Sequence, residues 1–293
     1  ILGVLYALTQ NDVKRMLAYS TIENAGISLL GLGAGMMALS AGRSGLAALG
    51  LAACLLHVLN HALFKGLLFL GAGGVVMATG TRHIEEMGGL ARRMPWTALF
   101  FLVGAAAISG LPLLYGFVSE WMLFEAFLFG FHVSSEALVR FLFPVAGALL
   151  ALTSALAAAC FVKAFGITFL ALPRREGAER AHESPALMLV PQAALAALCF
   201  VLGLAPGRVL EALRGVTGSL PGVSPAPEMV RGWLAIAPAP GQFDHFAPLL
   251  VALAVLAGLG LAWTMSLGAG HVVRRVPTWG CGGELTARTE YTA

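Results

Sequence analysis

Residues 46–79 decide the fold, and they read LAALGLAACLLHVLNHALFKGLLFLGAGGVVMAT. The stretch is apolar almost throughout, and its only basic side chains are those of His57, His61 and Lys65. A helix needs roughly 20 residues to cross the hydrocarbon core of a bilayer, and this stretch is longer. It therefore predicts a transmembrane helix that is tilted, or that protrudes at its glycine-rich end, residues 71–74.

The composition of the whole chain agrees with a membrane protein. Of its 293 residues, 58% are hydrophobic and 11% are charged, and the mean hydropathy is +0.84. Soluble domains carry about 25% charged residues. The low charge excludes an ordinary soluble domain, a disordered tail and a nucleic-acid-binding protein, which needs a dense basic surface.

Apolar segments long enough to span a bilayer recur along the chain. They are residues 16–40, 46–79, 95–129, 138–170, 186–204 and 247–267. Residues 1–9 look like the end of an earlier span, and backbone in lipid must satisfy its own hydrogen bonds, which favours helices. We expect an all-α fold, a polytopic transmembrane helix bundle of about six spans plus the end of a seventh. Neither terminus carries a terminal signal, so we interpret the chain as a fragment of a longer protein.

The segment 95–129 contains a helix breaker in its middle. Pro112 removes a backbone donor, and Gly110 and Gly116 on either side of it permit a bend. Backbone groups without helical hydrogen bonds are tolerated at membrane depth only where they face protein or a water-filled cavity. One interpretation is therefore a broken helix that forms part of a functional site. The other is a proline kink between packed helices.

The loops carry an uneven distribution of positive charge. Eleven Lys and Arg residues fall on one side of the bilayer and five on the other when alternate loops are assigned to opposite sides. The positive-inside rule makes the first side cytoplasmic. The loops on that side are residues 10–15, 80–94, 171–185 and 268–293. The long loop 205–246, with six prolines, is expected outside.

Lysine is rare in this chain, and it occurs in different places from arginine. Of the 18 Lys and Arg residues, only three are lysines, namely Lys14, Lys65 and Lys163. The two cations deep in apolar sequence are both lysines. Burying such a charge costs roughly 2.5–3.5 kcal/mol on insertion scales. A buried lysine, unlike arginine, exchanges a proton readily. Lys163 lies near the cytoplasmic loop, so snorkelling and a functional role both stay open.

The basic residues of the stretch 46–79 form a pattern. His57, His61 and Lys65 are spaced i, i+4 and i+8, which places them on one face of a helix. Three proton-exchanging groups on one face favour a proton relay. A structural polar seam is the alternative, and a zinc site is disfavoured because no HExxH motif is present.

Carboxylates add further candidate sites. Glu120 directly follows the helix break, a usual position for an ion or a proton in transporters, although an interface carboxylate is the alternative. Glu125 is expected to be an ordinary charge at the outer boundary. Glu23 lies inside the first span and is expected to pair with a lysine. Asp12 and Lys14 are candidates either for the relay or for a helix N-cap and a positive flank.

Several of these motifs resemble those of a known family. Residues 11–21, NDVKRMLAYST, resemble the DxKRxLAYST signature of the antiporter-like membrane subunits found in respiratory complex I, membrane-bound hydrogenases and Mrp cation/proton antiporters. The H-x3-H-x3-K run of residues 57–65 resembles the next motif of that family, and residues 110–120 look like its broken helix. Residues 161–166 and 277–283 are similar to the branch of hydrogenase-4 component B and the matching formate hydrogenlyase subunit.

The resemblance implies a domain organisation and a set of site residues. Residues 1–170 would form the second of two inverted repeats, incomplete at its N-terminus, and residues 171–293 would form trailing transmembrane helices with the loop 205–246 between them. The residues implied as a mid-membrane proton relay are Lys14, His57, His61, Lys65 and Glu120. The residues implied as further relay or pairing positions are Asp12, Glu23 and Lys163.

The resemblance also implies an activity. The chain would be a proton-translocating subunit of a redox-driven complex in the cytoplasmic membrane, with no catalytic residue, metal or cofactor of its own. Its partners would be other membrane subunits and a peripheral nickel–iron or iron–sulfur arm, and its ion would be the proton, with sodium as the other candidate. A subunit of an Mrp-type cation/proton antiporter and a structural membrane anchor are the alternatives.

Overall fold

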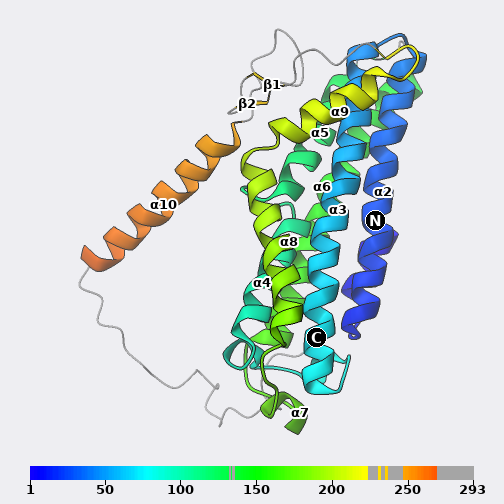
Figure 1. The fold of residues 1–293 in the computed structure, drawn as a ribbon. Coiled ribbons are helices and arrows are strands. Elements are labelled where there is room, and N and C mark those ends of the chain that lie inside the picture. The colour runs from blue at the N-terminus through cyan, green and yellow to red at the C-terminus, as the bar shows by residue number, and fades with distance from the viewer. Residues whose placement is uncertain (132, 134–135, 224–229, 232–234, 237–246, 269–293) are drawn as a thin grey trace.

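The computed structural model describes residues 1–131, 133, 136–223, 230–231, 235–236 and 247–268. This part of the chain is a helical bundle, apart from the two-residue antiparallel strands β1, Val230–Arg231, and β2, Ala235–Ile236 (Figure 1). The α-helices are α1 Leu2–Leu8, α2 Val13–Ser40, α3 Ser44–Thr79, α4 Pro95–Ile108, α5 Tyr115–Gly130, α6 Ala137–Phe169, α7 Glu176–Glu179, α8 Ala186–Leu204, α9 Gly207–Gly218 and α10 Pro248–Gly268. Two short 3-10 helices, Ile84–Glu86 and Leu90–Arg92, lie between α3 and α4. The expected fold class is confirmed.

The expected spans coincide with helices. Among the described residues, α2, α3, α6 and α8 are long and apolar enough to cross a membrane. Helix α10 includes a shorter apolar stretch, Leu250–Ser266. The expected third span, residues 95–129, is divided between α4 and α5, whose ends are separated by residues 109–114. Residues 1–9 contain only the seven-residue helix α1.

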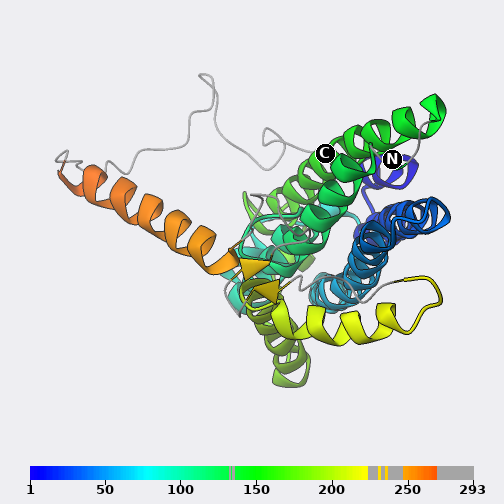
Figure 2. The same ribbon diagram turned by 90° about the horizontal axis from the view of Figure 1, so that it is seen from above.

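Helix α3 lies in the centre of the bundle and packs against α2, α4, α5, α8 and α9 (Figures 1 and 2). Its crossing with α2 depends on small residues, because a Cβ atom added to Gly50 would lie 2.9 Å from the Cα atom of Gly35. Close approach at glycine is a common way to pack helices in a membrane, where dispersion contacts replace the hydrophobic effect. Helix α10 is directed away from the bundle in both views, and it contacts the bundle at α8.

The break between α4 and α5 is a real interruption and not a kink. Gly110 has φ +63°, and Leu113 has φ +80°, a left-handed conformation that non-glycine residues rarely adopt. Pro112 lies between them and cannot donate a backbone hydrogen bond. The sequence prediction of one broken helix is therefore confirmed, and the break places the N-terminus of α5 inside the bundle.

Gly116→Ala is expected to destabilise the protein at this break. A Cβ atom at position 116 would overlap the carbonyl oxygen of Ala107, so α4 and α5 would have to separate. Overpacking of this kind costs about 1–3 kcal/mol. Gly26→Ala is the matched control, because nothing lies within 4 Å of a Cβ atom there. The measurement is thermal unfolding of the detergent-solubilised protein, and equal midpoints for the two variants would contradict the close approach.

Three of the loops that the charge count places on one side meet at one end of the bundle. Asp12 and His83 form an isolated β-bridge, and the Val13 N–H donates to the carbonyl of Arg82 at 3.0 Å. The Gly89 N–H donates to the carbonyl of Leu170 at 2.6 Å. Residues 269–293, expected on the same side, lie outside the described residues.

Two charged contacts secure this end of the bundle. The carboxylate of Glu86 accepts from Arg175 Nη1 at 2.6 Å, and hydrogen bonds from Thr81 and Arg175 hold the pKa of Glu86 below its usual value. The carboxylate of Glu183 accepts from the N–H of Trp96 at 2.8 Å and from Thr97 Oγ1 at 2.6 Å, and so caps the start of α4. These contacts tie the loops to the helices that they connect.

The opposite end of the bundle is covered in part by α9. The sequence left open whether residues 205–246 are ordered, and the structure places the amphipathic helix α9 across this end, with Leu210 and Thr217 buried (Figure 1). Within the loop, residues 224–229, 232–234 and 237–246 lie outside the described part of the chain.

Candidate functional site

The site is built around one face of α3, and we call His57, His61 and Lys65 the α3 stripe. His57 and Lys65 are buried and His61 is half-buried, so the face predicted from the i, i+4, i+8 spacing does lie inside the bundle. Helices α2, α5 and α6 supply its neighbours.

Lys65 reaches across to α2. Its Nζ atom donates to the carbonyl oxygen of Leu17 at 2.9 Å and to the hydroxyl of Ser20, and the side chain is 5% exposed. The ring centroid of Phe161 on α6 lies 6.0 Å from Nζ. Among the described residues, these contacts hold Lys65 inside the bundle without a carboxylate in direct contact.

His57 lies against the first turns of α5. Its Nδ1 atom is 3.0 Å from Ser119 Oγ, and Asn60 Nδ2 donates to Ser119 Oγ at 2.6 Å and to the carbonyl of Tyr115 at 2.8 Å. The Ser119 hydroxyl also lies 3.0 Å from the carbonyl oxygen of Gly116. If that hydroxyl donates to Gly116, the proton between Ser119 and His57 belongs to Nδ1, which leaves Nε2 as an acceptor.

Glu120 lies on α5 just beyond the helix break. The residue is 8% exposed, and its Oε2 atom accepts from Ser154 Oγ on α6 at 2.8 Å. A Cβ atom at Gly110 would lie 2.8 Å from the same Oε2 atom, so the glycine leaves room for the carboxyl group beside the break. The association of Glu120 with discontinuous backbone, expected from sequence, is found.

Glu23 lies on α2, one turn beyond Ser20, and is 4% exposed. Its expected direct ion pair with a lysine is not formed among the described residues, where Lys65 bonds to Leu17 and Ser20 instead. Glu23 is therefore a buried carboxyl group on the helix that also supplies Ser20 to Lys65.

The structure corrects the placement of Lys14. Helix α2 begins at Val13, so Lys14 lies in its first turn, exposed, at the end of the bundle where the loops meet. Asp12 caps the same turn, because its Oδ1 atom accepts from the N–H groups of Lys14 at 2.9 Å and Arg15 at 3.1 Å. Asp12 also lies 3.4 Å from Arg82 Nε. The N-cap and flank interpretations describe these two positions, and Lys14 is not on the buried axis.

Lys163 turns towards the chain that follows α1. Its Nζ atom donates to the carbonyl oxygens of Leu8 at 2.9 Å and Gln10 at 3.3 Å, and to Asn11 Oδ1 at 3.1 Å. The ammonium group thus neutralises the negative end of a helix, where carbonyl groups lack helical partners. Lys163 therefore reaches the start of the loop 10–15, and none of these three bonds is to the α3 stripe.

Sequence reasoning missed several participants in the site. These are Ser20, Ser119 and Ser154. Glu125 was expected at the outer boundary and is instead buried within α5, 6% exposed. In the part of the chain that the structure describes, no three His, Cys, Asp or Glu side chains are placed to hold a metal ion.

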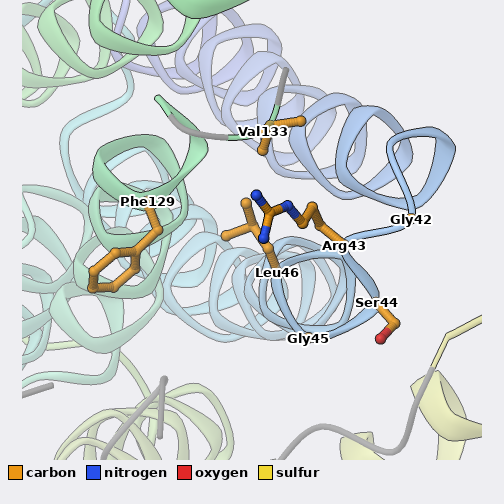
Figure 3. A pocket seen from close by; sticks show the side chains of 7 residues that line it. All are labelled: Gly42, Arg43, Ser44, Gly45, Leu46, Phe129 and Val133. Atoms are coloured by element: carbon orange, nitrogen blue, oxygen red, sulfur yellow. The ribbon is translucent and has the colours of Figure 1, made fainter. Parts of the chain in front are cut away.

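Two cavities lie outside the α3 stripe. One, of about 440 Å³, is at the turn between α2 and α3, where Figure 3 shows Arg43, Leu46, Phe129 and Val133 around it. The second, of about 270 Å³, is an apolar groove between α2, α5 and α6. Neither is lined by a residue of the stripe.

Comparison with known proteins identifies the family. Residues 1–150 match the family model described as NADH:quinone oxidoreductase/Mrp antiporter, TM, and the chain belongs to this family. It is 43% identical over 288 residues to hydrogenase-4 component B of Escherichia coli (strain K12). That alignment covers 96% of this chain and 42% of the relative. The chain is 46% identical over 211 residues to formate hydrogenlyase subunit 3 of the same organism, covering 72% and 34%.

A solved structure agrees with the fold. The membrane-bound sulfane sulfur reductase, an archaeal respiratory membrane complex, contains a chain with a TM-score of 0.75 and 27% identity, covering 97% of this chain and 42% of that one. The present chain thus spans about two fifths of the length of the first curated relative and of this structural neighbour. The resemblance read from the motifs is confirmed, and the protein is a multi-pass membrane protein.

Proposed function

We propose that this chain is part of a proton-translocating membrane subunit of a redox-driven complex of the hydrogenase, formate hydrogenlyase or NADH:quinone oxidoreductase kind. The observation that carries the proposal is the α3 stripe, with His57 and Lys65 buried, together with the buried residues Glu23 and Glu120 on the helices beside it. Titratable side chains inside a membrane are expensive and are usually functional.

The order of the groups supports a path along the bundle. Lys65 bonds to Ser20 on α2, the helix that also carries Glu23. His57 bonds to Ser119 on α5, and the next residue, Glu120, bonds to Ser154 on α6. The titratable groups therefore lie on adjoining helices that these contacts join.

The mechanism that follows is stepwise. A proton enters from the end where the loops meet and is held at Lys65, with His57 and His61 as neighbouring acceptors. A new positive charge near Lys65 would disfavour its ammonium form and drive the proton towards Glu120. Buried polar atoms without a protein partner normally bond to ordered water, and His57 Nε2, His61 Nε2 and Glu23 Oε2 have none among the described residues. Water along the stripe would carry the proton between these groups.

The setting of the chain is part of the same proposal. The loops 80–94 and 171–185 and the tail would face the cytoplasm, and the protein would lie in the inner membrane. Residues 1–170 would form the proton-translocating repeat and residues 171–293 the trailing helices. Its partners would be other membrane subunits and a nickel–iron or iron–sulfur arm that carries the electrons.

A cation/proton antiporter subunit is the second candidate. The description of the matching family model names Mrp antiporters as well as NADH:quinone oxidoreductases, and this observation favours the second candidate. The same buried groups would then exchange protons against a cation such as sodium, without electron transfer.

Purification of the intact protein from its native membrane, in a mild detergent, separates the two candidates. We expect co-purifying redox proteins, identified by mass spectrometry, with iron or nickel found by elemental analysis in constant ratio to this subunit. A homogeneous assembly of antiporter-like membrane subunits without any redox protein would contradict the redox-driven proposal and favour the antiporter.

A further inference from the structure

Three titratable groups of the site share one kind of partner, a serine hydroxyl from another helix. The pairs are Lys65 with Ser20 of α2, His57 with Ser119 of α5, and Glu120 with Ser154 of α6. All three bonds are buried or partly buried, and in each case the serine comes from a helix other than that of the titratable residue. The repetition at three separate helix contacts calls for a physical explanation.

Each of these serines has a second option within its own helix. Ser20 Oγ lies 3.1 Å from the carbonyl oxygen of Leu17 and Ser119 Oγ lies 3.0 Å from that of Gly116. Ser154 Oγ lies 3.1 Å from the carbonyl oxygen of Leu150. A hydroxyl has one proton and two lone pairs, so it can donate to its own helix while accepting from its partner, or donate to the partner instead.

Such a hydroxyl suits a group that changes its protonation state. An ionised carboxylate only accepts hydrogen bonds, and a protonated carboxyl group must also donate one. Ser154 can donate to the ionised Glu120, and can accept from the protonated form by turning its own proton to Leu150. In a buried site, an unsatisfied polar group has a high energetic cost. The hydroxyl avoids that cost in both states.

The same reasoning applies to Lys65 and His57. An ammonium group of Lys65 donates to Ser20, and a neutral amine can accept from it. For His57, Ser119 accepts from a protonated Nδ1 or donates to a bare one, while the hydrogen bond from Asn60 persists. Neither change requires the heavy atoms to move.

Lys163 provides the contrast. All three of its partners present oxygen atoms that accept, two of them backbone carbonyls, and none can donate to a neutral amine as oriented. Its surroundings therefore suit a permanent cation, whereas those of Lys65 suit a group that gains and loses a proton.

We propose that Ser20, Ser119 and Ser154 are positioning residues that keep Lys65, His57 and Glu120 hydrogen-bonded in both protonation states and thereby speed proton transfer. This inference rests on the proposed function and adds to it the residues that lower the energetic cost of changing the protonation state. It predicts that the hydroxyl group, and not the packing of the serine, is what matters.

Substitutions at Ser154 test the inference in the intact complex in sealed native membrane vesicles. Ser154→Ala removes the hydroxyl, and Ser154→Thr keeps it while adding a methyl group. We expect Ser154→Ala to lower the initial rate of proton translocation about tenfold, the scale of a lost hydrogen bond to a charged group, and Ser154→Thr to remain within about twofold of the wild-type rate. The matched control is Thr153→Val, because the Thr153 hydroxyl bonds to Leu149 of its own helix at 2.7 Å, and this variant should leave the rate unchanged.

The two substitutions distinguish a hydrogen-bonding role of Ser154 from a packing role. A packing role predicts the reverse order, with alanine tolerated and threonine harmful, and that order would overturn the inference, as would wild-type translocation in Ser154→Ala. If Ser154→Ala does not assemble, the same pair of substitutions at Ser20 decides, with Ser28→Ala as control because Ser28 bonds to Asn24 of its own helix at 3.1 Å. Failure of the proposed function itself is seen separately, as normal proton translocation by a Glu120→Gln variant.

Discussion

Glu120→Gln is expected to abolish proton translocation while electron transfer and assembly of the complex stay largely intact. Glutamine matches the size of glutamate and can still accept from Ser154 Oγ, which lies 2.8 Å from the native carboxyl oxygen. It cannot take up or release a proton. Loss of a group that transfers protons typically lowers a rate by about 100-fold or more.

The measurement pairs proton movement with electron transfer in the same sealed vesicles. A pH-sensitive dye reports acidification and the consumption of the electron donor reports turnover. The control is Glu211→Gln, which neutralises an exposed carboxylate on α9 and should change neither quantity. Acidification at the wild-type rate in Glu120→Gln would remove Glu120 from the path.

Replacing lysine by arginine should have opposite consequences at two positions. Arginine keeps the positive charge but remains protonated in proteins. Lys65→Arg should therefore lower proton translocation about 100-fold, the scale of a lost proton-transfer group. Lys163→Arg should stay within about twofold of wild type, because a permanent cation still neutralises the carbonyls of Leu8 and Gln10.

The two arginine variants act as controls for each other, since the chemical change is identical. The readout is protons translocated per electron, after the amount of assembled complex has been matched by immunoblot. Equal activity of Lys65→Arg and the wild type would show that Lys65 need not release its proton. Equal inactivation of both variants would contradict the distinction drawn from their hydrogen-bond partners.

The fold could be predicted closely because the bilayer restricts the choices. Residues 44–79 form one helix, and residues 46–79 were expected to do so, because apolar backbone in lipid must satisfy its own hydrogen bonds. The break at Pro112 was also visible, since proline and two glycines interrupt an apolar run. The helix α9 was not foreseen, because twelve residues flanked by prolines and glycines resemble a loop and gain their order from packing on α3.

The site was predictable where the signal lies within one stretch of sequence, and it was not predictable where contacts join separate helices. The spacing of His57, His61 and Lys65 is enough to assign them to a common helix face. Ser154 gave no signal, because its contact with Glu120 joins residues 34 apart in the chain. Lys14 was misplaced because a motif identifies a residue type and not its depth, and the start of α2 at Val13 puts that lysine at the end of the bundle.

The most direct test of the central claim is proton translocation by the purified wild-type complex in sealed proteoliposomes without sodium. The account predicts that addition of the electron donor acidifies or alkalises the lumen, that an uncoupler collapses this gradient, and that the gradient forms without sodium. Electron transfer at a normal rate with no pH change, in vesicles shown to hold an imposed gradient, would contradict the account.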